Sequence, residues 1–160
     1  MEKIYIGKIV NTHGIKGELR ILSDFMYKDK VFLVGNKLII DDKEYKIRTY
    51  RQHKMFDMIT LDNYNNINEV MFLLNKKVYI AKDNLHLDDD EILDEDLIKY
   101  KVLTTSGKCG IIKEIFVAGT NNKIIRVEFD KEVLIPLNSP IIKSISKSKG
   151  EIVVDLIEGM

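Results

Sequence analysis

Short apolar runs separated by polar or glycine-containing turns recur along the whole chain and predict β-strands. Residues 18–22 alternate polar and apolar side chains with a period of two, which is typical of a half-buried strand. Similar runs, rich in β-branched and aromatic residues, occur in the first half at 5–10, 38–40, 45–50, 58–61 and 78–80, and in the second half at 110–116, 123–129, 133–135, 141–145 and 151–156. Because no repeated crossover helices separate these runs, the pattern predicts an all-β protein made of two small β-barrels.

Two local signals add detail to the first half. Asn66 is a good helix N-cap with Glu69 three positions later, and apolar residues recur at helical spacing over 67–74. This predicts a helix that ends before Asn75. Residues 41–44 are polar and lie between two predicted strands, which predicts a four-residue hairpin connection.

Charge is distributed unevenly, although 25 basic and 25 acidic side chains cancel over the chain. Residues 1–82 contain 15 Lys and Arg against 10 Asp and Glu, residues 83–96 contain 8 acidic and no basic side chains, and residues 97–160 contain 10 basic against 7 acidic ones. Like charges repel, so a packed core is least expected at 83–96. We interpret 83–96 as an acidic linker between domains at 1–82 and 97–160; a solvated loop is the alternative.

Composition and motifs narrow the function. Hydrophobic residues make up 45% of the chain and charged ones 31%, as in ordinary globular proteins, and no apolar run reaches the roughly 20 residues of a membrane span. No signal-peptide pattern begins the sequence, and the single Cys109 permits no internal disulfide, so we expect a cytoplasmic protein. The three histidines have no metal-ligand spacing, and no nucleophile, phosphate-loop or dinucleotide motif is present. We therefore expect no enzyme, no metal site and no cofactor.

The segment 12–20 is the one short stretch of the sequence whose residue types suggest a binding site. Gly14 and Gly17 permit positive φ and a close approach of the backbone to a phosphate, while His13, Lys16 and Arg20 supply positive or switchable charge. The alternative is that the two glycines shape a tight barrel corner and Lys16 is merely solvated.

A second basic and aromatic cluster lies at a predicted strand end. It contains Arg48, Tyr50, Arg51, His53, Lys54 and Phe56. This composition is typical of an edge that contacts single-stranded nucleic acid or phosphate. Half-buried strand aromatics beside exposed basic residues would give the same composition.

The segment 6–19 closely resembles the N-terminal signature of the RimM family of ribosome maturation factors. Segments of the second half resemble the PRC-barrel domain of the same family, in the family's order: 96–98, 110–115, 119–122, 134–136 and 152–159. The resemblance covers nearly the whole chain. The N-terminal motif is fairly specific, whereas the later segments are persuasive only together.

The resemblance implies a cytoplasmic, non-enzymatic assembly factor for the 30S ribosomal subunit. Such factors have an N-terminal six-stranded barrel, similar to the second domain of translation elongation factors, followed by a PRC barrel. They bind the head of the immature 30S particle through the small-subunit ribosomal protein numbered nineteen and 16S rRNA. We expect a monomer with no membrane partner.

The candidate sites follow from the matched segments and from the charge pattern. The candidates for contact with RNA or the ribosome are His13, Gly14, Lys16, Gly17, Arg20 and Arg51, and those for contact with a protein partner are Ile92, Leu93 and Pro136. Many family members have a tyrosine pair where this chain has Ile92 and Leu93, so the apolar character is kept and the phenol hydroxyls are lost. Lys99 replaces the glycine that usually follows Asp-Leu-Ile.

Two other functions stay open. One is an RNA-binding barrel without a specific protein partner. The other is an rRNA-processing enzyme that uses His13 as a general base, which requires a second titratable group such as Glu18 beside it.

Overall fold

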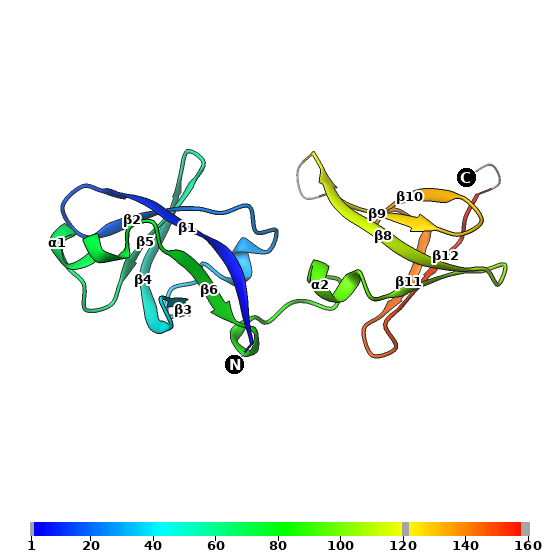
Figure 1. Cartoon of the computed structure of the whole chain (residues 1–160), viewed down its shortest axis with the longest axis horizontal. Helices are drawn as coiled ribbons and strands as arrows, with labels where there is room; N and C mark the ends of the chain where they lie inside the picture. The colour runs from blue at the N-terminus through cyan, green and yellow to red at the C-terminus, as the bar shows by residue number, and fades with distance from the viewer. Residues whose placement is uncertain (1, 120–121, 158–160) are drawn as a thin grey trace. The chain divides into compact units, whose positions relative to one another are not determined.

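The computed structural model describes residues 2–119 and 122–157, and the chain divides into two compact units, residues 1–87 and 88–160 (Figure 1). Both units consist mainly of β-strands, as the hydrophobic pattern predicts. Parts of two predicted segments, residues 120–121 of the turn at 119–122 and residues 158–159 of the terminal motif, lie outside the described residues. No helix in the described ranges is long and apolar enough to cross a membrane.

The first unit is a closed six-stranded barrel with the strand order β1-β2-β5-β4-β3-β6. Its strands are β1 (Lys3–His13), β2 (Glu18–Leu22), β3 (Lys37–Ile40), β4 (Lys43–His53), β5 (Phe56–Leu61) and β6 (Lys77–Ala81). All neighbours are antiparallel, and β6 closes the barrel by pairing with both β1 and β3. Inward-facing side chains such as Ile6, Leu19 and Ile59 form a continuous core. The six-stranded N-terminal barrel implied by the family resemblance is confirmed.

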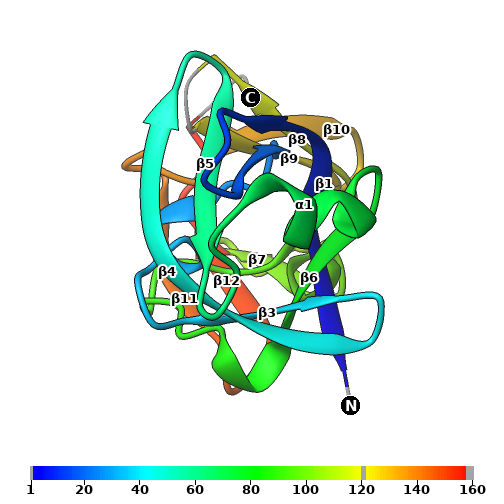
Figure 2. The ribbon, with the colours of Figure 1, turned by 90° about the vertical axis from the view of Figure 1, so that its left-hand side faces the viewer.

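The predicted helix is real at its start but shorter than expected. α1 (Ile67–Val70) is capped by Asn66, whose side-chain oxygen accepts a hydrogen bond from the Glu69 backbone N–H at 3.2 Å. The chain then tightens into a 3-10 turn, η2 (Met71–Leu73), so the predicted single helix over 67–74 is wrong. Val70 and Leu73 point into the core, and Figures 1 and 2 place α1 across one end of the barrel. Tertiary packing of these two side chains, rather than helix length, explains why the segment folds this way.

The hairpin between β3 and β4 is tighter than predicted. Asp41 and Asp42 alone form the turn, with φ values of 55° and 63°, where the sequence pattern predicts a connection of four residues. Positive φ at both central residues matches the twist of the flanking strands, and Asp tolerates this conformation better than most side chains. Two further 3-10 turns, η1 (Lys28–Lys30) and η3 (Lys82–Asn84), lie in connections of the first unit.

The second unit contains a six-stranded sheet with the order β10-β9-β8-β7-β12-β11. Its strands are β7 (Lys101–Thr104), β8 (Cys109–Ala118), β9 (Asn122–Glu128), β10 (Glu132–Pro136), β11 (Ile142–Ser146) and β12 (Glu151–Val154). The sequence pattern does not predict β7, which is short and begins at an exposed lysine. It is a strand because it is paired on both sides, parallel to β12 and antiparallel to β8.

A short helix, α2 (Asp94–Leu97), precedes this sheet. Ile92 and Leu97 are buried in the core of the second unit. The boundary between the units falls after Leu87, inside the segment 83–96 that the charge pattern predicts as a linker. Residues 88–96 therefore belong to the second unit, and Ile92 packs in its core although its neighbours are acidic.

Candidate nucleic-acid interface

Strand register brings several of the candidate residues onto one outer face of the barrel. Arg20 on β2 lies opposite Asn11 on β1 and Met58 on β5, and Met58 lies opposite Arg51 on β4. Directly opposed residues of a sheet point to the same side, and so do residues two positions apart on one strand. This outer-face cluster consists of His13, Glu18, Arg20, Arg51, His53 and Phe56.

An ion pair joins β2 and β4 within the outer-face cluster. Arg51 Nε and Nη2 donate to the two carboxylate oxygens of Glu18 at 2.9 and 2.7 Å. This paired geometry is the strong form of an Arg–carboxylate contact. The hydrogen bond from Arg51 lowers the pKa of Glu18 below its ordinary value, against the opposing effect of partial burial. Glu18 is therefore ionised at neutral pH and neutralises part of the charge of Arg51.

Arg20 occupies the centre of the outer-face cluster. Its Nη2 lies 2.7 Å from His13 Nδ1, and its guanidinium lies 5.7 Å from the centre of the Phe56 ring. A guanidinium can only donate, so His13 Nδ1 accepts and the neutral His13 ring has its proton on Nε2. Arg20 is thus held by a hydrogen bond on one side and by an aromatic face on the other.

The structure brings together two histidines that are 40 positions apart in the sequence. The rings of His13 and His53 are 5.8 Å apart, centre to centre, and meet edge to face. Desolvation, followed by the positive charges of Arg51, Lys54 and Arg20, lowers the pKa of His53. His53 is therefore neutral at pH 7, because a further positive charge at this crowded basic position is unfavourable.

Two polar atoms of the outer-face cluster keep unused hydrogen-bonding capacity. Arg20 Nε and His53 Nδ1 are covered by neighbouring atoms and have no hydrogen-bond partner among the described residues. Such groups are uncommon in folded proteins. A ligand can reach either atom only after neighbouring side chains move.

The glycine loop between β1 and β2 has positive φ at both glycines, as predicted, with 67° at Gly14 and 86° at Gly17. Gly17 is buried, and a Cβ added to it would lie 3.2 Å from the backbone oxygen of Asn66. The Ile67 backbone N–H also donates to the Ile15 carbonyl at 2.9 Å. Gly17 therefore permits close packing of the loop against the start of α1. This is the structural role that the sequence left open as an alternative, in which a glycine shapes a tight corner of the barrel. Gly14 and Lys16 are exposed, and Ile15 between them is 76% exposed.

The second basic and aromatic cluster of the sequence is divided by the fold. Arg48 donates to the Asn65 side chain at 2.7 Å and to the Tyr64 carbonyl at 3.0 Å, so it anchors the segment before α1. The Tyr50 hydroxyl donates to the buried carboxylate of Asp57 at 2.6 Å. Burial and this contact raise the pKa of Tyr50. Arg51, His53 and Phe56 of the predicted cluster lie on the outer face, whereas Tyr50, the neighbour of Arg51 on β4, points to the opposite face and packs against the core.

The protein-partner candidates Ile92 and Leu93 are buried, with 4% and 7% of their surfaces exposed. Lys123 on β9 is 6% exposed; its Nζ donates to the Ile92 carbonyl at 2.9 Å and lies 2.6 Å from Asp94 Oδ1. Lys147 Nζ donates to the Asp88 carbonyl at 2.7 Å. The segment 88–94 is therefore held on the second unit by two lysines and by the side chain of Ile92.

Other candidates stay apart from these groups. Pro136 is half-buried at the end of β10, opposite Ile124 on β9. Glu18, the group that a general-base function for His13 would need, is already bound to Arg51. Across the residues that the structure describes, no three side chains of His, Cys, Asp or Glu are grouped so that they could hold a metal ion.

Sequence reasoning did not place His53, Phe56 and Glu18 beside His13 and Arg20. Alternation provides a signal for part of this arrangement, since positions 51 and 53 share one face of β4, and positions 56 and 58 share one face of β5. Lys123, which holds the segment before α2, could not have been found from the sequence in this way. Nothing in its local pattern distinguishes it from the other lysines of the chain.

Comparison with known proteins defines the class from both halves of the chain. The family model described as the RimM N-terminal domain matches residues 4–85, and the PRC-barrel domain model matches residues 89–160. The chain is therefore a two-domain protein with a RimM-type barrel followed by a PRC-barrel domain. It belongs to the RimM family, and the resemblance drawn from its sequence motifs is confirmed.

Similar proteins match the chain over nearly its full length. The ribosome maturation factor RimM of Oceanobacillus iheyensis is 37% identical over 99% of this chain and 96% of that protein. The factor of the same name from Bacillus mycoides is 33% identical over 97% of this chain and 96% of that protein. The solution structure of the N-terminal domain of RimM from Thermus thermophilus aligns with 54% of this chain and 98% of that domain, with 17% identity and a TM-score of 0.46.

Proposed function

We propose that this protein is a maturation factor for the 30S ribosomal subunit that acts by binding and not by covalent chemistry. The observation that carries the proposal is the match of both domains, in order, to relatives named as ribosome maturation factors. The protein binds the head of the immature particle through 16S rRNA and the small-subunit protein numbered nineteen. Its place of action is the cytoplasm, and it works as a monomer.

The outer-face cluster and the neighbouring glycine loop are the proposed RNA-contacting surface. Arg20, Arg51, Lys16 and Lys54 supply four positive charges, and Glu18 offsets one of them. Phe56 and His53 supply ring surfaces beside these charges, which is the combination that unpaired nucleotides bind. A phosphate that reaches Arg51 competes with Glu18, so the exposed Lys16 and Lys54 support this surface more directly.

The second unit is the proposed protein-contacting part. Buried Ile92 and Leu93 act there by shaping the segment that precedes α2 and not as side chains that leave the core to meet the partner. The exposed acidic residues around them, Asp89, Asp90 and Glu95, face solvent and complement a basic ribosomal protein. Once one domain has bound the particle, the covalent link raises the effective concentration of the other domain at the same particle.

Sedimentation of the purified protein tests the proposal. The protein is mixed with immature 30S particles, mature 30S particles, naked 16S rRNA or the purified head protein, at two salt concentrations. We expect preferential binding to the immature particle and measurable binding to the isolated head protein. Equal and strongly salt-dependent binding to every RNA-bearing sample would contradict the proposal and indicate an RNA-binding barrel without a specific protein partner.

A further inference from the structure

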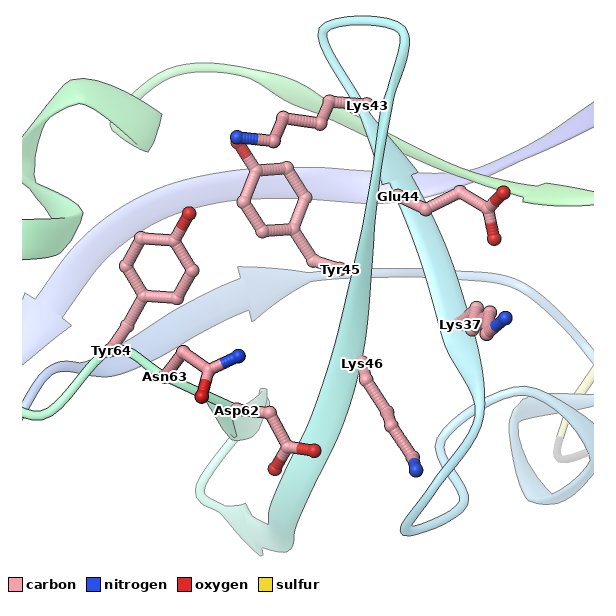
Figure 3. A pocket seen from close by; sticks show the side chains of 8 residues that line it. All are labelled: Lys37, Lys43, Glu44, Tyr45, Lys46, Asp62, Asn63 and Tyr64. Atoms are coloured by element: carbon pink, nitrogen blue, oxygen red, sulfur yellow. The ribbon is translucent and has the colours of Figure 1, made fainter.

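A pocket of about 500 Å³ opens in the first unit where β4 extends beyond the end of β5 (Figure 3). β5 ends at Leu61, whereas β4 begins at Lys43, so residues 43–46 of β4 pair with β3 alone. The Asp62 backbone N–H donates to the Lys46 carbonyl at 2.9 Å, and from there the chain turns away through Asn63, which has a φ of 73°. The residues that line the pocket are Lys37, Lys43, Glu44, Tyr45, Lys46, Asp62, Asn63 and Tyr64.

Aromatic rings form one side of this pocket. The rings of Tyr45 and Tyr64 are 5.7 Å apart, and Tyr64 is followed by Phe72 at 6.4 Å. Tyr45 is buried and packs in the barrel core, whereas Tyr64 is half-buried and Phe72 is 54% exposed. Burial and the neighbouring Tyr64 raise the pKa of Tyr45. Its ring is therefore neutral and fixed, and Tyr64 is the less buried of the two tyrosine rings that line the pocket.

Three lysines line the pocket together with these rings, and Figure 3 shows Lys43 and Tyr45 on one side of β4 and Lys46 on the other, at the edge of β4 that β5 leaves unpaired. Lys43 Nζ lies 5.6 Å from the centre of the Tyr45 ring. Within the described part of the chain, Lys37, Lys43 and Lys46 form no ion pair, although Glu44 and Asp62 line the same pocket. Three ammonium groups without carboxylate partners at one opening form a site for an anion.

The combination of a stacking ring, unpaired ammonium groups and carboxylate acceptors matches one nucleotide. A phosphate binds to lysines, a base stacks on an aromatic face, and hydroxyl or amino groups donate to Glu44 or Asp62. The volume lies at the lower end of the roughly 300–1,000 Å³ of small-ligand sites. We propose that this pocket binds one nucleotide of single-stranded RNA, with its base against Tyr64 and its phosphate among Lys37, Lys43 and Lys46.

The inference rests on the proposed RNA-binding function and adds a contact that the outer-face cluster does not provide. Tyr45 faces the barrel core, whereas Arg51 lies on the outer face of the same strand. A strand of RNA bound at both places is held at two points of the first unit. The carboxylates can accept a hydrogen bond from a ribose 2′-hydroxyl, which favours RNA over DNA.

Fluorescence anisotropy with labelled decauridine tests the stacking ring. Tyr64→Leu removes the aromatic face, and Tyr64→Phe is the matched control that keeps it. We expect Tyr64→Leu to weaken binding by about fivefold or more, since stacking on one ring contributes at least that factor. The Tyr64→Phe variant is expected to bind within about twofold of the native protein, a limit we set well inside the stacking effect. Equal affinity of Tyr64→Leu and the native protein would overturn the inference.

A second variant avoids the core, because Tyr64 packs against it. The double variant Lys43→Gln, Lys46→Gln changes only exposed side chains of the pocket. The control is the double variant Lys8→Gln, Lys77→Gln, which removes the same charge from exposed positions on β1 and β6. We expect the first pair alone to lower the slope of log affinity against log salt by roughly 1.4, because a single-stranded contact contributes about 0.7. Identical slopes for both pairs would contradict the assignment, as would equal affinity for decauridine and decadeoxyuridine.

Sedimentation with immature 30S particles, run in parallel, separates the two proposals. If the native protein binds the particles and decauridine while the pocket variants bind decauridine equally well, the pocket inference fails and the proposed function stands. If the native protein binds no immature particle but the pocket variants still lose decauridine affinity, the proposed function fails and the pocket is a nucleotide site of another kind of RNA-binding protein.

Discussion

At the scale of single residues, the outer-face cluster shows how pairing limits the charge that a basic sequence presents. Arg51 is held by Glu18 through two hydrogen bonds, and Arg20 is held between His13 and Phe56. These contacts fix the orientation of both guanidinium groups before any ligand arrives, which lowers the entropy lost on binding. They also mean that Glu18 competes with an incoming phosphate for Arg51.

Glu18→Gln tests this competition. Removal of the carboxylate charge frees Arg51, so affinity for single-stranded RNA should rise by about two- to fivefold, the size of one close interaction at a solvent-exposed surface. Anisotropy titrations of native protein, Glu18→Gln and the exposed control Asp24→Asn measure the effect. Weaker RNA binding by Glu18→Gln would show that the ion pair is needed to shape the surface.

The same ion pair predicts a pH dependence. Because the folded-state pKa of Glu18 is lowered from 4.5, its contribution to stability is complete at neutral pH and is lost as the pH falls below about 4.5 through the lowered pKa. The contribution is less than about 1 kcal/mol, since Arg51 is half exposed. Urea unfolding of native protein and Glu18→Gln should therefore differ at pH 7 and converge near pH 3.

At the scale of elements, two short segments are held in place by contacts with elements that lie far from them in the sequence. The loop 14–17 packs on the start of α1, and the segment before α2 is pinned to β9 by Lys123. Both segments carry residues that the sequence marks as candidates for binding. Their conformations depend on packing inside one unit, so substitutions there change stability as well as function.

The glycine loop provides a matched pair of substitutions. Gly14→Ala introduces only the strain of a positive φ, whereas Gly17→Ala also brings a Cβ to 3.2 Å from the Asn66 oxygen. We expect losses of about 1 kcal/mol for Gly14→Ala and about 2–3 kcal/mol for Gly17→Ala in the free energy of unfolding. Urea denaturation measures both. Equal losses would show that the loop moves away from α1 without penalty.

Lys123→Met tests how the segment before α2 is held. Methionine keeps the buried aliphatic volume but leaves the Ile92 carbonyl without its lysine donor and removes the partner of Asp94. The loss should be about 1–3 kcal/mol, with faster amide hydrogen exchange over 92–98. Lys131→Met on the exposed surface is the control. Unchanged exchange over 92–98 would mean that apolar packing alone holds the segment.

At the scale of the whole molecule, two units with separate cores share one chain. Each unit has a continuous buried core of its own, so fragments 1–87 and 88–160 should each fold. A mixture of the two fragments should bind immature 30S particles at least about tenfold more weakly than the intact chain, because the covalent link supplies effective concentration. Circular dichroism of each fragment and particle sedimentation measure this. Equal binding by the mixture would show that the units act independently.

Much of the fold could be predicted from local pattern. Alternating or β-branched runs located all but one of the described strands, because the side-chain period of two is a local property. β7 lacked that signal and is a strand only through its pairing with β8 and β12. The helix over 67–74 was predicted too long, since its last turn adapts to the barrel core rather than to helix geometry.

The sequence by itself determined the all-β class, the family and the two glycines with positive φ, because each depends on short segments whose residues are neighbours along the chain. Only the tertiary structure decided which basic side chains share a face, that Ile92 and Leu93 are buried, and that three lysines line one pocket with Tyr64. Those arrangements depend on strand register and on contacts between residues far apart in sequence. The register between β4 and β5, with its shift between Ile47 and Thr49, has no local signature and is set only when the two strands pair.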